Sequence, residues 1–333
     1  MSYQGTTYSD ISPRTNVYAV AKMLATAQNQ LVLEQFAKQE KMPKNKTQTI
    51  KWRRPVLFDV SATTLTEGVT PAPQVFEYED VFTTISQYGA YVPFTDVIQD
   101  THEDPVLNDI SKNCGMQAAA TKELIIWNAI VAGNNVIYAN GSARTDVNTP
   151  ITLEDIRAAR QELELNRANK VTSRIPASSD IATEPVNASF VLYGHKALDR
   201  DFREMDSFVP VERYSNFNVI SEHEIGKVEE CRIILTTHAI PFYGAGSATL
   251  NGMHSRDAAA VDVYASVMFG EEAFACVPLK GRESVEMAIT NPKMGTPGDE
   301  LGQRGSVAWK FWYAAKILND NWLVRIESGA TAL

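Results

Sequence analysis

The chain has 333 residues, of which 44% are hydrophobic and 21% charged, and its formal net charge at pH 7 is −9. This composition is that of a globular protein with a sizeable core, so it argues against a disordered chain. The acidic balance argues against a dedicated nucleic-acid reader, because such proteins carry a broad basic face. The 3 cysteines, Cys114, Cys231 and Cys276, form no CxxC pair, which favours reduced, buried thiols over a disulfide framework.

The N-terminal region is predicted to be an arm rather than a targeting segment. Its first residues, MSYQGTTYSD, lack the basic and apolar regions of a secretory signal. Ser12 and Pro13 suit the start of a helix, and Pro43 would end that segment. The longest apolar stretches, such as LIIWNAIVAG, fall short of the roughly 20 apolar residues that a membrane span needs.

A basic cluster follows in KNKTQTIKWRRP, residues 44–55. No acidic residue stands between Glu40 and Asp59, and that interval holds Lys41, Lys44, Lys46, Lys51, Arg53 and Arg54. Residues 47–54 alternate, with Ile50 and Trp52 on one face and cations on the other, which predicts a strand with one dry side. A nucleic-acid patch, a solvated strand and a surface that grips another protein chain are the open interpretations at this point.

The basic strand is predicted to belong to a long hairpin. Residues 59–75 are rich in Thr, Gly and Pro and would form a polar tip. The following residues, from Val75 to Asp100, hold many aromatic and β-branched side chains and predict a second extended arm. An isolated two-stranded ribbon is only marginally stable in water, so it must fold back on the body or lie on a neighbouring molecule.

Residues 104–133 are predicted to form one long helix. Asp104 is a good cap, Pro105 suits the first helical position, and Gly133 with Asn134 can end the helix. Apolar side chains recur at three- and four-residue steps between these ends. Such a helix would be roughly 42 Å long, which is unusual in a globular domain.

The rest of the chain predicts an α/β segment and a return to strands. A helix is expected to begin at Thr152, which forms a capping-box pattern with Asp155. Loops are expected at 170–188 and 244–254, and a short helix from His195 to about Met205. Strands are expected at 189–193, 228–238, 261–270 and 284–292, followed by two long strands within 307–328 that join at Asn319–Asn321.

No pattern identifies a catalytic or metal-binding site. The acids around His102 precede Pro105, and acids at a helix start complement the helix dipole. His223 and Glu224 begin an HExxH-like string, but position 227 is Lys. The sequence has no GxSxG, P-loop or GxGxxG motif. We therefore expect a structural protein with no enzymatic activity, no cofactor and no metal.

Several motifs, in their order along the chain, resemble the major capsid proteins of tailed phages, specifically the podovirus N-four-type family with the Hong Kong 97-like fold. They extend from residue 11 to residue 328 and are ISPRT, PKNKTQTIKWRRP, LTEGVTPAP, QYGAYVPFTDVIQDTHEDPVL, HEIGKVEECRIILT, FGEEAFACVPLKG and LGQRGSVAWKFWYAAKILNDNWLVRIES. Residues 172–188 and 243–260 match no family pattern and are interpreted as local insertions.

The resemblance implies an α+β capsid fold. Its parts would be an N-terminal arm (1–56), an extended loop (57–95), a peripheral domain (96–150 and 280–333, with the spine helix at 104–133) and an axial domain (151–279). It also implies a major capsid protein that assembles as hexamers and pentamers into an icosahedral head shell around phage DNA. The implied locations are the host cytoplasm during assembly and the virion afterwards.

The resemblance further implies partners: other copies of the chain, a portal, a separate scaffolding protein, in some phages a decoration protein, and packaged double-stranded DNA through non-specific lumenal contact, with no membrane. Two other classes stay open, an encapsulin-like cargo shell and a hydrolase with a divergent site. We predict intersubunit contacts in the basic strand and the hairpin tip, at Lys44, Lys46, Ile50, Lys51, Trp52, Arg53, Arg54, Leu65, Glu67, Val69 and Pro71.

For the basic strand, Ile50 and Trp52 are expected to be buried and the cations to pair with acids of the same or a neighbouring chain. The competing hypothesis places these cations at the lumen, in contact with DNA.

Overall fold

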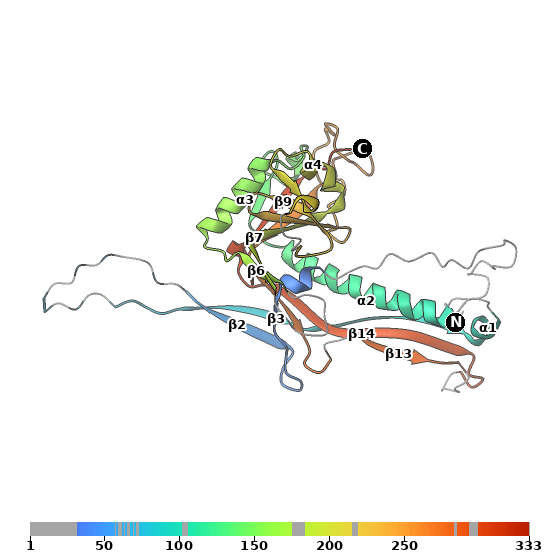
Figure 1. Ribbon diagram of the computed structural model, residues 1–333. Helices are drawn as coiled ribbons and strands as arrows, with labels where there is room; N and C mark the ends of the chain where they lie inside the picture. Colours follow the sequence, from blue (N-terminus) through green and yellow to red (C-terminus); the bar gives the residue numbers. More distant parts are fainter. Residues whose placement is uncertain are drawn as a thin grey trace.

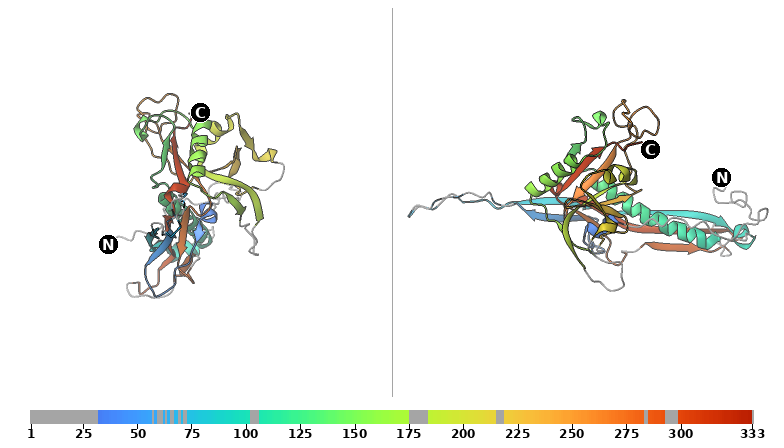
Figure 2. Two further views of the ribbon diagram at one scale, coloured as in Figure 1. Left: turned by 90° about the vertical axis from the view of Figure 1, so that its left-hand side faces the viewer. Right: turned by 45° about the horizontal axis from the view of Figure 1, so that its top comes forward.

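The structure is a computed structural model that describes residues 32–56, 73–101, 106–174, 184–214, 219–282, 285–292 and 299–332, together with 58, 62, 64, 67, 68 and 70. The helix expected at Ser12 and the cap expected at Asp104 lie outside these residues. An elongated lower part carries a ribbon at one end, and a more compact upper part stands above it (Figure 1). The two views in Figure 2 show the same stacking from other directions.

The lower part is built on a five-stranded sheet. Its longest strand, β14 (Arg304–Ile317), is antiparallel to β4 (Ser86–Thr95) on one side. On its other side it pairs with β13 (Glu286–Thr290) and then with β12 (Phe274–Pro278), and β1 (Lys38–Gln39) adds to β12 in parallel.

One face of the lower sheet is covered by a long helix. After α1 (Asp96–Thr101), helix α2 (Val106–Ile130) runs along the sheet, within the range where the sequence predicts a long helix (Figure 1). Its 25 residues correspond to roughly 38 Å. Buried side chains of α2, such as Ala118 and Trp127, share a core with Val307 and Phe311 of β14.

The upper part is an eight-stranded mixed sheet. Its order is β5 (Val136–Tyr138), β15 (Leu323–Ser328), β11 (Tyr264–Phe269), β7 (Glu184–His195), β10 (Cys231–Thr236), β9 (Glu224–Val228) and β8 (Phe208–Pro210), with β6 (Val171–Arg174) also paired to β7. Short helical turns connect these strands: η4 (Arg144–Asp146), η5 (Lys196–Leu198), α4 (Asp199–Arg203) and η6 (Val211–Arg213).

Helix α3 (Leu153–Leu165) packs on the upper sheet through Ile156, Ala159 and Leu163. The predicted capping box is confirmed: Asp155 N donates to Thr152 Oγ1 at 3.3 Å, and Thr152 N donates to Asp155 Oδ2 at 2.9 Å. The expectation for the thiols is also confirmed, because all three cysteines are free and buried.

The two predicted C-terminal strands and their connection near Asn319–Asn321 are present, but the strands do not pair as a hairpin. β14 lies in the lower sheet and β15 in the upper sheet, and η7 (Asp320–Trp322) carries the chain between them. β14 is buried mainly at alternate positions, which suits a sheet with one covered face, whereas β15 is buried at nearly every position. That difference matches the separate sheets in which the two strands lie.

The sheets also divide the chain at different residues from the boundaries that the resemblance implies. β12 falls within the range 151–279 expected for the axial domain, yet it belongs to the lower sheet. β5 and β15 fall within the ranges expected for the peripheral domain, yet they belong to the upper sheet. Membership of a sheet depends on long-range strand pairing, which residue order alone does not specify.

Within the described residues the chain therefore passes between the two parts three times: after α2, between β11 and β12, and between β14 and β15. The three connections are bonded to one another. Asn134 N and Nδ2 donate to the Asp320 carboxylate, Leu318 N donates to Ala273 O at 2.9 Å, and Gly270 N donates to Trp322 O at 3.2 Å.

A buried carboxylate lies where the arm, α2 and the upper sheet meet. Glu123 of α2 is 1% exposed. It accepts hydrogen bonds from Val32 N and Leu33 N, at the start of η3 (Leu33–Phe36), and from the Tyr193 hydroxyl of β7. Desolvation raises the pKa of Glu123 to about 7. The junction is thus held by an ionisable group with protein donors on two sides.

Candidate assembly interface

The hairpin predicted around the basic cluster is present as a separate two-stranded ribbon. Strand β2 (Thr49–Pro55) pairs antiparallel with β3 (Tyr78–Thr84), and the ribbon extends away from the lower part (Figure 1). The register places Lys51 opposite Phe82 and Arg53 opposite Asp80. Directly opposite residues share a face, so cations, an acid and an aromatic ring lie together on one side.

The other face of the ribbon contacts its own chain at the base. Ile50 and Trp52 are half-buried and pack beside the buried side chains of Met42, Ile85 and Val277. The Trp52 indole Nε1 also donates to Glu40 Oε2 at 2.6 Å. The alternation read from the sequence is correct, and the partners of the dry face described here belong to the same chain.

The cations of β2 are paired with acids of β3. Lys51 Nζ lies 2.5 Å from Asp80 Oδ2, Arg53 Nε lies 3.1 Å from Asp80 Oδ1, and Arg54 pairs with Glu79. The hydrogen bond from Lys51, followed by that from Arg53, lowers the pKa of Asp80. The same chain therefore supplies the acids that face this strand.

The remaining predicted contact residues lie on the surface or outside the described residues. Lys44 is exposed, and its Nζ lies 3.4 Å from Gly281 O, whereas Lys46 is exposed with no recorded ion pair among the residues the structure describes. At the tip, Glu67 is exposed in a turn. Leu65, Val69 and Pro71 fall outside the described residues.

Sequence reasoning missed an exposed aromatic strip on the ribbon, formed by Phe58, Phe76, Tyr78 and Phe82. Each of these side chains is between 51% and 54% exposed. Phe76 lies between Phe58 and Tyr78, with ring centroids 5.9 and 4.6 Å away. The stretch VFEYEDVF predicted a strand, but aromatic content alone does not reveal whether a face is covered. An exposed apolar patch of this kind typically marks an interaction site.

A second uncovered apolar site lies on β13. Met287 and Ile289 are 44% and 49% exposed. The register sets them opposite Trp309 and Val307, whose side chains are buried in the core that α2 shares. Met287 and Ile289 therefore extend the covered face of the lower sheet beyond the cover that the described residues provide.

Within the described ranges, no group of three or more His, Cys, Asp or Glu side chains could hold a metal ion. Glu224 is the first residue of β9 and His223 lies in the turn before it, whereas a zinc-binding HExxH motif would lie on a helix. The Glu224 carboxylate instead accepts hydrogen bonds from Tyr214 and Ile220 N. No helix in the described part of the chain is long and apolar enough to cross a membrane.

The fold is that of phage capsids. The solved capsid of Ralstonia phage GP4 is similar in structure, with a TM-score of 0.68 and 10% sequence identity. The alignment covers 99% of this chain and 99% of the GP4 capsid chain. The capsid of cyanophage Pam1 matches 100% of both chains, with a TM-score of 0.65 and 11% identity. The capsid of cyanophage P-SCSP1u matches 95% of this chain and 93% of its own, with a TM-score of 0.61 and 13% identity.

The sequence places the chain more narrowly. Residues 78–326 match the profile of the phage capsid protein family, and the chain belongs to that family. The major capsid protein of Pseudomonas phage KPP21 is 23% identical over 266 residues, which are 74% of this chain. The match spans 66% of that relative, just under two thirds of its length. The resemblance inferred from the motifs is confirmed for the phage capsid protein family and for the fold, and the narrower N-four-type assignment stays a prediction.

Proposed function

We propose that this chain is a major capsid protein whose copies associate as hexamers and pentamers into the icosahedral head shell of a tailed phage, enclosing its DNA. The observation that carries the proposal is the ribbon, with its exposed aromatic strip of Phe58, Phe76, Tyr78 and Phe82. A two-stranded ribbon with an apolar face is only marginally stable in water, and it gains stability when another surface covers that face.

The ribbon is suited to joining neighbouring copies. Contacts in a closed shell of identical chains can be heterologous, with a patch on one copy meeting a different patch on the next. Its base is fixed to the body by Trp52 and Ile50, while the aromatic strip stays about half exposed. Burial of apolar area contributes about 25 cal/mol per Å², and many modest contacts per subunit act together.

The paired charges would give this contact its register. Lys51, Arg53 and Asp80 share the face of the aromatic strip. Charged groups at an interface contribute more to specificity and orientation than to affinity. The proposed intersubunit contacts comprise this face and the hairpin tip, and the exposed Met287 and Ile289 of β13 are a candidate receiving surface.

The proposal extends to the partners that the capsid resemblance implies. Assembly would take place in the host cytoplasm with a portal and a separate scaffolding protein, in some phages with a decoration protein, and packaged DNA would touch the lumen without sequence specificity. The internal pairing of Lys51 and Arg53 with Asp80 supports a seam strand over a DNA-binding one, because the shared carboxylate offsets one of their two positive charges.

Negative-stain microscopy of the purified full chain tests the proposal. The wild type is expected to form closed shells. A double variant, Phe76→Ser with Phe82→Ser, is expected to stay as folded subunits with an unchanged circular dichroism spectrum. Leu165→Ser, which replaces a side chain 75% exposed in the upper part, is the matched control and should form shells. Wild-type shell yield from the double variant would contradict the role of the strip.

A cargo shell is the nearest alternative. Particles from infected cells are expected to contain nuclease-protected DNA. Particles that instead enclose an enzyme and no DNA would support an encapsulin-like shell. Turnover that disappears on mutation of His102 or His223 would support the hydrolase.

A further inference from the structure

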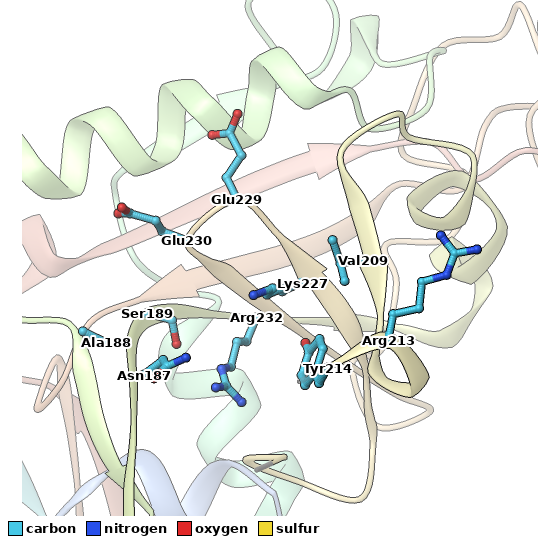
Figure 3. Close-up of a pocket in the computed structure, with 10 residues that line it drawn as sticks. All are labelled: Asn187, Ala188, Ser189, Val209, Arg213, Tyr214, Lys227, Glu229, Glu230 and Arg232. Carbon is cyan, nitrogen blue, oxygen red and sulfur yellow. The ribbon is translucent and has the colours of Figure 1, made fainter. Parts of the chain in front are cut away.

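A cavity of about 250 Å³ opens on the upper part, between the strands β7, β8, β9 and β10 and the turn η6. Its size exceeds the roughly 30 Å³ that a water molecule occupies in the liquid, so it has room for a small polyatomic ion with water. The polar side chains around it are shown in Figure 3 and include Asn187, Ser189, Arg213, Tyr214, Lys227 and Arg232.

The two acids at the edge of the cavity are engaged elsewhere. Glu229 pairs with Arg157 and Arg160 at 2.7 and 2.8 Å, and Glu230 pairs with Lys170. Figure 3 shows both carboxylates directed toward α3 and away from Ser189 and Arg232. Their negative charge is therefore neutralised outside the cavity.

Lys227 is the less fully balanced cation at the cavity, whereas Arg232 is paired with the buried Glu224. Lys227 has no recorded ion pair within the described residues, and its Nζ lies 5.4 Å from the centre of the Tyr214 ring. Arg232 is 6% exposed and shares Glu224 with the Tyr214 hydroxyl, at 3.4 Å from Glu224 Oε1. Arg213 adds a third positive charge at the outer edge. In a chain of net charge −9, this concentration of positive charge is local.

A buried hydroxyl also lines the cavity without a partner. Ser189 is 5% exposed, and its Oγ makes no hydrogen bond with the residues that the structure describes. Buried polar atoms are almost always paired, and an unpaired one often indicates an absent ion or water. The neighbouring cations favour a negatively charged group at this position over a neutral one.

We propose that this cavity binds a small oxyanion, a phosphate or carboxylate group, with Ser189 Oγ and Lys227 Nζ as donors and Arg232 as the buried positive charge behind them. All of these residues belong to one chain, so the site does not depend on the proposed shell. The anion could come from solution or from an acidic side chain of a neighbouring copy, and the two sources can be separated by experiment.

Inorganic phosphate is the probe. The thermal unfolding midpoint of the unassembled full chain is measured against phosphate, with chloride at matched ionic strength as reference. For the wild type we expect a saturable rise. Ser189→Ala and Lys227→Ala are each expected to weaken the apparent affinity about tenfold, because each removes a hydrogen bond to a charged group. Lys196→Ala, an exposed cation of the same part, is the control and should leave the affinity unchanged.

Ser189→Ala keeps the test valid if Lys227→Ala fails to fold, because the hydroxyl has no partner to lose. The absence of a rise in the wild type, or an equal rise in all four proteins, would overturn the proposal. Cryo-electron microscopy of shells then identifies the source. Phosphate density at Ser189 assigns a free ion, and a neighbour's carboxylate there assigns the adjoining copy. A cavity empty in shells prepared with saturating phosphate would refute the site.

Discussion

The Tyr193 hydroxyl donates a 2.9 Å hydrogen bond to Glu123 Oε1 and itself accepts one of 2.7 Å from Thr236 Oγ1. This chain of bonds connects α2 to two strands of the upper sheet. Val32 N and Leu33 N bind the same carboxylate from the arm. The Glu123 side chain thus contacts two elements, the arm and β7, that are far from α2 in the sequence.

The first prediction is a pH-dependent stability controlled by Glu123. Its pKa in the folded chain is about 7, raised from 4.5 mainly by desolvation. The folded state therefore binds the proton more tightly than the unfolded state, so stability is highest below pH 4.5 and falls as the pH rises to about 7. The loss is about 3 kcal/mol, at about 1.4 kcal/mol per pKa unit.

Glu123→Gln removes this titration. Denaturant unfolding of the unassembled chain measures the free energy of unfolding of both proteins between pH 4.5 and about 7. Over this range the variant's free energy of unfolding should rise by about 3 kcal/mol relative to that of the wild type. Glu300→Gln, at an exposed acid, should follow the wild-type profile. Tyr193→Phe removes a bond that lowers the pKa of Glu123 and should move the loss to higher pH. Parallel profiles for Glu123→Gln and the wild type would rule the assignment out.

The second prediction concerns the charge pairs of the ribbon. Reversal of Lys51 and Arg53 to Glu places two new carboxylates beside Asp80 and should lower shell yield strongly, because like charges on one ribbon face repel. Shell yield is measured by sedimentation and microscopy.

Adding Asp80→Lys to the reversed pair should restore much of the yield, since it recreates opposite charges. Normal shell yield from the reversed pair would exclude a seam role. Normal empty shells with salt-sensitive DNA packaging would favour lumenal contact with DNA.

The third prediction isolates the anchor of the ribbon base. Trp52→Phe keeps an aromatic ring and removes the Nε1 bond to Glu40, so we expect a stability loss of about 1 kcal/mol. Trp52→Ala also removes apolar contacts with the cluster around Met42 and should cost about 2–3 kcal/mol. Both are measured by denaturant unfolding, with Glu40→Gln as the matched test of the polar bond. Equal losses of stability for Trp52→Phe and Trp52→Ala would show that apolar packing at Trp52 contributes nothing to stability.

The fourth prediction concerns the hairpin tip. Deletion of residues 65–73 should yield a soluble, folded subunit that cannot form stable shells, because none of the described residues of the tip belongs to the two main core clusters. Shell formation and the thermal midpoint of any shells are the measurements. Shells of wild-type stability would show that the tip is dispensable.

Local patterns in the sequence predicted local structure well. The Thr152 and Asp155 spacing predicted the helix cap, since both partners lie within one turn. The alternation of Ile50, Lys51, Trp52 and Arg53 predicted which side chains share a face, because the period of a strand is fixed at two.

Relationships that depend on long-range pairing could not be predicted. Asp80 faces Arg53 only through the register of β2 against β3, and the sequence does not specify that register. Ser189, Lys227 and Arg232 come from three strands whose neighbours are fixed by the whole sheet. The exposure of Phe76 and Phe82 follows from what does not cover them, and composition carries no signal of that.

The three bonded connections between the lower and upper parts have a mechanical consequence. Tension applied to one part reaches the other along three covalent paths, and the bonds of Asp320, Ala273 and Trp322 distribute the load among them. A protease cut in one connection would leave two intact. A shell built from such subunits could therefore sustain isolated backbone breaks at this position without shedding the upper part of any subunit.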